Sequence, residues 1–331
     1  MLEKLFAYFI RKRNSKFDTG EILPVKCKTP VISVGNLSVG GTGKTPLVIY
    51  ISNKLSELGN KVAVIGRGYK RKSKGEIVVS DGKNILADVS EAGDEMLLIA
   101  EKTCCPVLVH SKKYEAGLSA EKLFNVDYIL LDDGFQHRKL SRKCDIVLID
   151  RVSLENPFLL PKGRLRESFD ALARADIICL TKGAKIQDLI RKLPKNTKPN
   201  LKIFEVNFVQ ASAYSLFNKN NASPADKKYI AIAGLANPKN FFEMLTNNNY
   251  CIIEKINFSD HHNYTKSDIL KIINSAKRNN TACIATTEKD AVKLKKYKAE
   301  FINNNIDIFV FPLEVIIKGD FISAIKECVS S

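Results

Sequence analysis

Residues Pro30 to Pro46 read Pro-Val-Ile-Ser-Val-Gly-Asn-Leu-Ser-Val-Gly-Gly-Thr-Gly-Lys-Thr-Pro. The apolar run at the start predicts a buried strand, the glycines predict a loop, and Lys44-Thr45 open an amphipathic segment that predicts a helix. Strand, glycine-rich loop and helix in this order are the layout of a P-loop. The backbone N–H groups of such a loop converge on phosphate oxygens at the helix N-terminus, where the peptide dipoles favour anions.

The loop predicts specific contacts with a nucleotide. We expect Lys44 to reach the terminal phosphates and Thr45 to hold Mg²⁺. The strict pattern G-x-x-x-x-G-K-[ST] requires glycine where this chain has Ser38. A glycine-rich loop that binds no nucleotide is the alternative, and the predicted strand and helix on either side argue against it. The residues expected to bind the nucleotide are Gly40, Gly41, Thr42, Gly43, Lys44 and Thr45.

The composition indicates folded domains and an anionic partner. The chain has 331 residues, of which 45% are hydrophobic, and this is enough for the cores of two domains. Its formal net charge of +16 predicts attraction to a nucleic acid, a membrane surface or phosphorylated small molecules. These values exclude a disordered or fibrous protein, but they do not choose among the three partners.

The cysteines predict a reduced protein. They occupy positions 27, 104, 105, 144, 179, 251, 283 and 328, and no two of them form a C-x-x-C pair. Several lie in apolar runs, where cysteine behaves as a small hydrophobic residue. We therefore expect free thiols, a cytoplasmic protein and no structural zinc site.

The first residues predict an amphipathic helix. Its apolar face carries Leu2, Leu5, Phe6, Phe9 and Ile10, and basic residues follow at 11, 12, 13 and 16. This pattern suits a helix that lies in an anionic membrane interface. A helix packed on its own domain is the alternative. No run of about 18 apolar residues occurs, so we expect no membrane-spanning segment.

Apolar periodicity beyond the P-loop predicts alternating strands and helices. We expect strands at 61–65, 107–109, 128–133, 145–150 and 176–181, and helices at 47–58 and 112–123. This alternation is typical of an α/β fold with a doubly wound, mostly parallel sheet of the P-loop NTPase type.

A second, smaller α/β domain is expected after a polar stretch. The polar residues at 218–226 include Ser223-Pro224 and indicate a crossing between domains. Beyond them we expect strands at 229–233, 251–256, 282–287 and 307–311, a helix from Asn237-Pro238, and helices at 265–276 and 321–329. The expected domains are a P-loop core at 1–205, a linker at 206–228 and a C-terminal domain at 229–331.

Two carboxylates close the apolar strand at 128–133. Asp132 and Asp133 stand where proteins with a P-loop place a carboxylate on Mg²⁺ or its waters. Arg166 and Glu167 follow a loop marked by Pro161 and Gly163, and such side chains suit phosphate and metal contacts at strand ends. A surface ion pair explains the spacing of Arg166 and Glu167 equally well.

Two further segments contain groups that can transfer protons. Asp94 precedes a predicted helix, where acidic residues commonly interact with the helix dipole. Asp260-His261-His262 follows a predicted strand, and no third ligand with suitable spacing stands near it for zinc. A histidine that accepts a proton, backed by a carboxylate, is the more economical functional interpretation. A structural loop histidine is the alternative.

Seven sequence blocks occur together and in order. They are Gly-Asn-Leu-Ser-Val-Gly-Gly-Thr-Gly-Lys-Thr-Pro (35–46), Arg-Gly-Tyr (67–69), Gly-Asp-Glu (93–95), Asp-Asp-Gly-Phe-Gln-His (132–137), Leu-Arg-Glu (165–167), Asp-His-His (260–262) and Thr-Glu-Lys-Asp-Ala-Val-Lys (287–293). With these blocks the chain closely resembles the tetraacyldisaccharide 4'-kinase family of lipid A biosynthesis. A series of seven blocks is far more specific than a P-loop alone.

The resemblance implies an enzyme that uses ATP and Mg²⁺ to phosphorylate the 4'-hydroxyl of a tetraacylated glucosamine disaccharide 1-phosphate. It implies a peripheral protein at the cytoplasmic face of the bacterial inner membrane. Its partners would be this acylated lipid and an anionic membrane surface. We expect no nucleic acid partner, and we expect a monomer.

The resemblance also assigns roles to residues. It implies that Thr45, Asp132, Asp133 and Glu167 hold Mg²⁺, and that Lys44 contacts phosphate. It implies that Asp94 and a histidine of the Asp-His-His block abstract the proton of the sugar hydroxyl, and we choose His261 over His262 because Asp260 is adjacent. We expect Arg166, with Lys44, to stabilise charge on the transferred group. No role beyond helix capping follows for the block at 287–293.

Two other classes of protein remain as alternatives. A membrane-docking P-loop ATPase or GTPase switch of the deviant type carries lysine before the first loop glycine, where this chain has Val39. A GTP-specific Asn-Lys-x-Asp block is also absent, since Thr181-Lys182-Gly183-Ala184 lacks the aspartate. A nucleic-acid binder could use the basic stretch at 67–74, but no binding module is recognisable.

Overall fold

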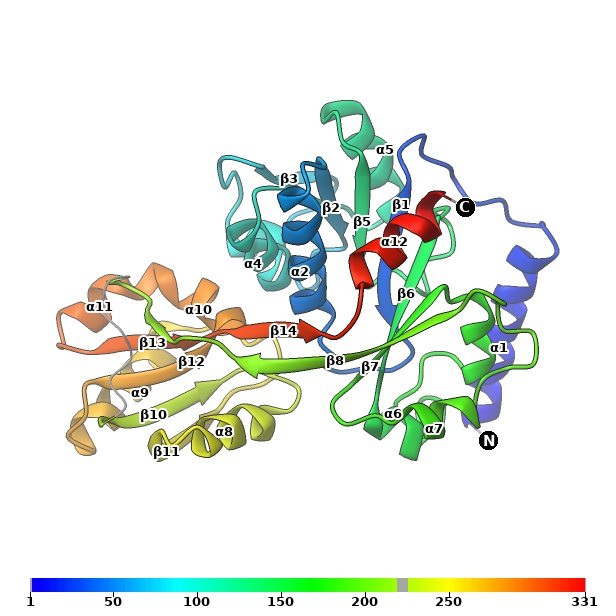
Figure 1. Cartoon of the computed structure of the whole chain (residues 1–331). Coiled ribbons are helices and arrows are strands. Elements are labelled where there is room, and N and C mark those ends of the chain that lie inside the picture. The colour runs from blue at the N-terminus through cyan, green and yellow to red at the C-terminus, as the bar shows by residue number, and fades with distance from the viewer. Residues whose placement is uncertain (1, 219–225, 331) are drawn as a thin grey trace. The chain divides into compact units, whose positions relative to one another are not determined.

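The computed structural model describes residues 2–218 and 226–330 (Figure 1). The chain forms two compact units, one of Met1–Phe208 with Val315–Ser331 and one of Val209–Glu314. The expected C-terminal domain at 229–331 therefore differs from the second unit, because residues 315–330 belong to the first unit. The expected linker at 206–228 lies partly outside the described residues, and its first residues belong to a strand.

The first unit is built on a nine-stranded sheet in the order β14-β8-β7-β6-β1-β5-β2-β4-β3. Its strands are β1 (Val31–Asn36), β2 (Val62–Gly66), β3 (Ile77–Asp81), β4 (Pro106–Val109), β5 (Tyr128–Asp132), β6 (Cys144–Asp150), β7 (Ile177–Thr181), β8 (Lys202–Gln210) and β14 (Leu313–Ile317). The seven strands from β8 to β4 pair in parallel, and β3 is antiparallel to β4. The expected mostly parallel sheet is confirmed.

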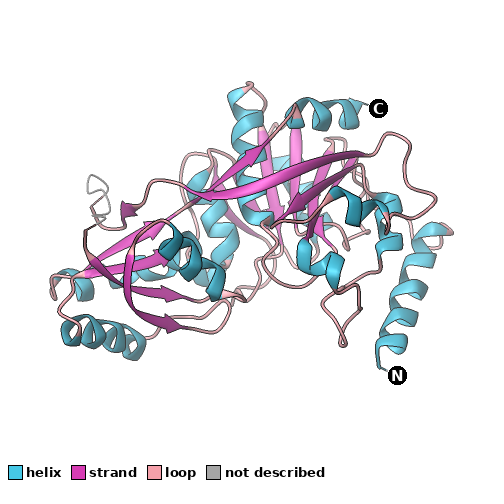
Figure 2. Cartoon of the chain, turned by 60° about the horizontal axis from the view of Figure 1, so that its bottom comes forward, coloured by secondary structure: helices cyan, strands magenta, loops and turns pink. Residues whose placement is uncertain are grey.

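Helices cover both faces of this sheet (Figure 2). Its helices are α1 (Leu2–Asp18), α2 (Lys44–Glu57), α3 (Val89–Ala92), α4 (Asp94–Lys102), α5 (Lys113–Leu123), α6 (Arg151–Glu155), α7 (Ile186–Ile190) and α12 (Phe321–Ser330), with a 3-10 turn, η1, at Phe169–Arg174. Helix α5 packs on alternate strand residues that include Ala63 and Ile129. The intervening residues, such as Val64 and Leu130, point to the opposite face, where α2 contacts the same strands. The sheet is therefore doubly wound.

Helix α1 docks on the first unit through its C-terminal half. Arg138 donates to the Asn14 carbonyl at 3.1 Å and pairs with Asp18 at 2.7 Å. The N-terminal half leaves Leu5 and Phe9 more than half exposed, at 52% and 59%. The alternative of a helix packed on its own unit is therefore confirmed for the C-terminal half, and binding to a membrane interface stays a prediction. In the described ranges, no helix is long and apolar enough to cross a membrane.

The second unit contains a five-stranded sheet in the order β11-β10-β12-β13-β9. Its elements are β9 (Tyr214–Ser215), β10 (Lys228–Ala233), α8 (Pro238–Asn247), β11 (Cys251–Asn257), α9 (Lys266–Arg278), β12 (Cys283–Thr287), α10 (Glu288–Leu294), a 3-10 turn η2 (Lys295–Tyr297), α11 (Lys298–Ile302) and β13 (Asp307–Phe311). Strands β11, β10, β12 and β13 are parallel, and β9 runs antiparallel to β13. The expected smaller α/β unit is confirmed.

The block at 287–293 has a structural role beyond capping. Thr287 caps α10 by accepting the Asp290 N–H, as predicted. The Asp290 carboxylate also accepts the Gly234 N–H at 2.9 Å and lies 2.9 Å from Lys293 Nζ, and both charged side chains are buried. The Gly234 carbonyl in turn accepts the His261 N–H at 3.3 Å. This buried ion pair therefore supports the backbone of the histidine loop at residues 260–262.

Candidate active site

The P-loop connects β1 to α2 in the first unit. Asn36, the last residue of β1, donates from Nδ2 to Thr42 Oγ1 at 2.9 Å, and both side chains are buried. Gln136 Nε2 donates to the Asn36 carbonyl at 2.8 Å. These side-chain hydrogen bonds hold the loop in place from within the protein.

The backbone around Ser38 is extended, which explains why glycine is not needed there. Ser38 forms an antiparallel bridge with Leu165, and Arg166 N donates to the Leu37 carbonyl at 2.6 Å. The segment 164–166 thus lies along the loop as a short strand would. An L side chain fits extended backbone without strain. The departure from the strict P-loop pattern therefore has a structural cause, and the same pairing brings Arg166 to the loop.

Gly43 ends the loop in a conformation that favours glycine. Its φ of 100° lies in the left-handed region, and it is the N-cap of α2. A Cβ on Gly43 would lie 2.1 Å from the Phe208 ring. Gly41 has ordinary φ and nothing within 4 Å of its Cβ position. The loop therefore requires glycine at 43 for steric reasons that do not apply at 41.

Asp133 joins the P-loop lysine to the segment 164–166. Its carboxylate lies 2.9 Å from Arg166 Nη1 and 3.4 Å from Lys44 Nζ. Burial opposes ionisation, but the charges of Lys44, Lys113 and Arg166 hold the pKa of Asp133 well below its usual range. Asp133 is therefore ionised and faces three cations at the carboxyl end of β5.

The pKa of Asp132 is shifted in the direction opposite to that of its neighbour. It is 5% exposed, and its Oδ1 has no hydrogen-bond partner within the described part of the chain. Burial raises the pKa of Asp132 from 3.8 to about 7, and the negative charges of Glu95 and Asp133 contribute to the rise. Three carboxylates thus lie close enough to repel one another, an arrangement that a divalent cation would relieve.

Asp94 begins α4 beside the turn at 67–69. Gly93 has φ of 81°, and a Cβ there would lie 2.9 Å from the Tyr69 carbonyl, so glycine permits this close approach. Asp94 is buried, and its Oδ1 accepts the Glu95 N–H at 2.9 Å. The Asp94 carboxylate therefore stands at the N-terminus of α4, the positive end of its helix dipole.

Glu167 forms ion pairs with two arginines. Its side chain is 1% exposed and lies 2.8 Å from Arg174 Nη2 and 3.3 Å from Arg13 Nη2. Asn14 Nδ2 donates to Glu167 Oε2 at 2.9 Å. Two of these partners come from α1, so Glu167 also anchors that helix.

The histidine loop lies in the second unit. His261 adopts φ of 57°, and its Nε2 lies 3.1 Å from Lys289 Nζ and 3.7 Å from Asp260 Oδ2. Lysine can only donate, so Nε2 accepts in this contact. Lys289 lies 3.6 Å from Asp260 as well, which completes a three-residue cluster.

His262 has a different environment from its neighbour. Its Nε2 lies 3.0 Å from Asp268, the residue that shares the capping box of α9. Its ring stacks on Phe258 with centroids 4.8 Å apart. These contacts engage His262 in the structure of the loop, which favours His261 as the chemically active histidine.

The family match covers nearly the whole chain. Residues 1–330 match the family described as tetraacyldisaccharide-1-P 4'-kinase. The chain belongs to this family. Relatives named tetraacyldisaccharide 4'-kinase include one from Halothermothrix orenii, 39% identical over 96% of this chain and 88% of the relative, and one from Desulfotalea psychrophila, 35% identical over 90% and 88%.

The fold agrees with that of a solved member of the kinase family. LpxK from Aquifex aeolicus, solved in complex with ATP, has a TM-score of 0.77 and 29% identity with this chain. The similarity covers 99% of this chain and 100% of the solved chain. The P-loop kinase fold expected from the sequence is therefore confirmed.

The structure brings some predicted kinase residues together and places others apart. Lys44, Asp133 and Arg166 are in direct contact, and Asp132 is the chain neighbour of Asp133. Thr45 is the second residue of α2, directly after Lys44. Glu167 contacts α1 and Arg174, as described above. Asp94 belongs to the first unit and His261 to the second, so their pairing stays a prediction.

Three charged residues escaped the sequence interpretation. Glu95 contributes to the raised pKa of Asp132. It belongs to the Gly-Asp-Glu block at 93–95, but the sequence predicts no role for it. Lys113 is buried and donates to the carbonyls of Asp132 and Asp133 at 2.7 Å each. No sequence signal marks it, because a lysine in the first turn of an amphipathic helix is usually solvated. Lys289 lies in a recognised block whose only assigned role was capping.

Gly43→Ala should destabilise the first unit, and Gly41→Ala is its matched control. Strained backbone and the clash with Phe208 should lower the free energy of unfolding by ~1–3 kcal/mol in the first variant. The second should change it by less than about 0.5 kcal/mol. Denaturant titration measures both. Equal stabilities would contradict the steric requirement at Gly43.

Asp132→Asn should change how stability depends on pH. The raised pKa means that the folded protein holds a proton that the unfolded chain releases between about pH 4 and about pH 7. Wild-type stability should therefore fall as pH rises through this window, and the loss should be smaller by a few kcal/mol in the variant. Urea titrations without Mg²⁺ or nucleotide measure this. Parallel pH profiles would contradict the raised pKa.

Proposed function

We propose that this chain transfers the terminal phosphate of ATP to the 4'-hydroxyl of a tetraacylated glucosamine disaccharide 1-phosphate. The contact of Asp133 with both Lys44 and Arg166 carries this proposal, because it gathers phosphate-binding cations beside a P-loop in a member of this kinase family. The nucleotide is ATP, which the solved relative contains. No observation favours the alternative of an ATPase or GTPase switch.

The residues at the end of β5 fit Mg²⁺. Carboxylate and hydroxyl oxygens are the ligands that this ion prefers. Asp132 has a buried oxygen without a hydrogen-bond partner, and we propose that it binds Mg²⁺ with Asp133 and Thr45. When bound, Mg²⁺ neutralises charge on the phosphate oxygens. Glu167 is the fourth proposed ligand, and it would first have to exchange its ion pairs with Arg13 and Arg174.

Lys44 and Arg166 are proposed to stabilise the phosphoryl group during transfer. Asp133 holds both side chains at the loop before substrate arrives, so little reorganisation is needed. The glycine-rich backbone from Gly40 to Gly43 would supply N–H donors to the remaining phosphate oxygens.

Asp94 and His261 are proposed to remove the proton from the sugar hydroxyl. His261 Nε2 lies 3.1 Å from Lys289 Nζ, and an imidazole nitrogen is the group that most often accepts a proton in catalysis. Asp94 is buried and adjacent to a helix N-terminus, and a carboxylate of this kind can stabilise an imidazolium. The two residues come from different units, so an experiment on their coupling tests the pair most directly.

We propose that α1 attaches the protein to the cytoplasmic face of the bacterial inner membrane. The exposed apolar residues Leu2, Leu5 and Phe9 lie on a helix that also carries basic residues. Basic side chains near an anionic surface each contribute about 1 kcal/mol. We also propose a monomer, and sedimentation at working concentration tests this.

The phosphoryl-transfer assay tests the whole proposal. Radiolabelled ATP and the tetraacylated disaccharide 1-phosphate should yield a doubly phosphorylated lipid. Lys44→Ala should lower the rate by at least ~10³-fold, because phosphate charge then lacks its cation. Lys54→Ala, on the exposed face of the same helix, is the control and should retain activity. Full activity in Lys44→Ala would remove the loop from the mechanism.

His261→Ala should lower the turnover number by roughly 10²- to 10⁴-fold with little change in ATP affinity. His262→Ala is the matched control and should keep most of the turnover. Combining His261→Ala with Asp94→Asn should cost much less than the product of the single effects, because the pair acts as a unit. Steady-state kinetics of wild type, the three single variants and the double variant measures these effects. If the effects of the two substitutions on the turnover number multiply, Asp94 and His261 act independently, and the proposed pair is wrong.

Leu5→Gln with Phe9→Gln should weaken binding to anionic vesicles by at least ~10-fold, because both side chains lose apolar burial in the interface. Both residues are exposed in the structure, so the fold should be retained. Ile186→Gln with Ile190→Gln, exposed positions on α7, is the control. Equal vesicle binding by wild type and the α1 variant in a flotation assay would refute the anchor.

A further inference from the structure

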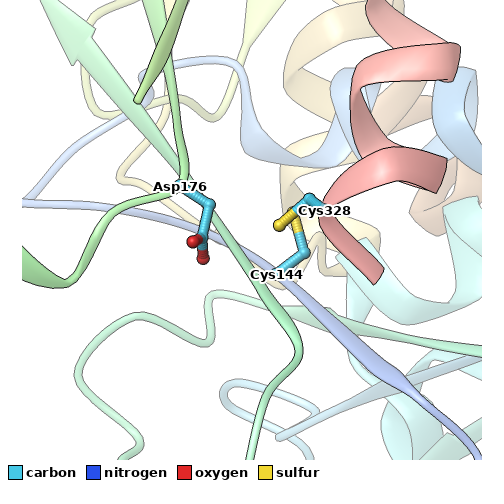
Figure 3. A group of neighbouring side chains, drawn as sticks. All are labelled: Cys144, Asp176 and Cys328. Carbon is cyan, nitrogen blue, oxygen red and sulfur yellow. The ribbon is translucent and has the colours of Figure 1, made fainter. Parts of the chain in front are cut away.

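Two cysteines and an aspartate meet at the end of the sheet opposite the P-loop. Cys144 is the first residue of β6, Asp176 directly precedes β7, and Cys328 lies on α12 (Figure 3). One ligand atom from each residue lies within 4.8 Å of the other two. All three belong to the first unit. Because β6 runs parallel to β1, this cluster lies at the strand starts, whereas the kinase residues lie at the strand ends.

The donor set suits zinc. Thiolate sulfur and carboxylate oxygen are ligands of Zn²⁺, and in a tetrahedral site they stand roughly 3.3–3.8 Å apart. We propose that Cys144, Asp176 and Cys328 bind Zn²⁺, with water as the fourth ligand, and that the ion fastens α12 to the starts of β6 and β7. The sequence led us to expect no structural zinc, because these cysteines are far apart in the chain.

The surroundings of Asp176 orient it and balance charge. Asp145 N donates to Asp176 Oδ2 at 2.8 Å, as the outer contacts of metal-binding carboxylates commonly do. Lys198 Nζ lies 2.6 Å from Asp176 Oδ1. The nearby Asp145 carboxylate is already paired with Arg142 at 2.9 Å.

Formal charges add to zero in the proposed site. Binding releases one proton from each thiol, so two thiolates and one carboxylate face the doubly charged ion. The single negative charge that remains is balanced by Lys198. A buried ion is far less costly when its surroundings are neutral overall. The Lys198 side chain is 42% exposed, so its ammonium group can move toward solvent when the ion binds and still remain near Asp176.

The site would act on the last helix of the chain. Helix α12 contacts α2 and β6, and Phe321 at its start is buried. Near its other end, Cys328 Sγ donates to the Lys143 carbonyl at 3.5 Å, a weak hydrogen bond. Zn²⁺ would replace this weak contact by two thiolate bonds and would add a link to β7.

Cobalt titration of the reduced full-length protein tests the proposal. Co²⁺ in a site with thiolates gives an intense near-ultraviolet absorption that water or carboxylate ligands do not give. Wild type should bind one Co²⁺ with this absorption, and Zn²⁺ should displace it. Cys328→Ser and Asp176→Asn should each weaken binding by at least ~10-fold. Cys104→Ser, which removes an exposed cysteine, is the control and should bind as wild type does.

Thermal unfolding gives a second readout that is independent of activity. Zn²⁺ should raise the unfolding temperature of wild type and Cys104→Ser, with little effect on Cys328→Ser. Absence of the thiolate absorption in wild type, or an equal absorption in Cys328→Ser, would overturn the proposal. A Cys144–Cys328 disulfide in protein that binds no Co²⁺ after reduction would identify a redox pair instead, and would also overturn it.

Discussion

The ionised carboxylate of Asp133 is the interaction on which the arrangement of the nucleotide site depends. It lies between Lys44 from the P-loop helix and Arg166 from the segment that pairs with the loop. Beneath it, Lys113 donates to the backbone carbonyl of the same residue. Three chain segments that bring positive charge are thereby held around one negative side chain, which prevents their mutual repulsion from opening the site.

The adjacent Asp132 has a different environment, and its pKa is shifted in the opposite direction. Asp133 faces cations, whereas Asp132 is buried and is repelled by Glu95 and Asp133. Neighbouring carboxylates with divergent pKa values are typical of sites prepared for charge transfer or metal binding. The free protein carries less negative charge here than its composition suggests, and a divalent cation would restore the missing charge by displacing a proton.

The fold was largely predictable because its central strands are continuous apolar runs next to a recognisable loop. The strands β3 and β14 were missed, since both lie at sheet edges and are only partly buried. Motif residues of the site were also predictable, but the burial of Lys113 and its hydrogen bonds to the Asp132 and Asp133 carbonyls were not. Its position looks solvated, and only the tertiary fold brings it beneath β5. Cys144 and Cys328 escaped for the same reason, because spacing rules detect only ligands that are close in sequence.

The order of synthesis gives the β14 and α12 segment a particular consequence. These elements complete the first unit, yet the ribosome makes them only after residues 209–314. Until they are made, β8 is the edge strand of the large sheet, because its partner β14 is absent. Strand β6 also lacks its contact with α12. Such an edge is a template for wrong pairing. Synthesis of β14 and α12, rather than formation of the central strands, therefore sets the moment when this exposure ends.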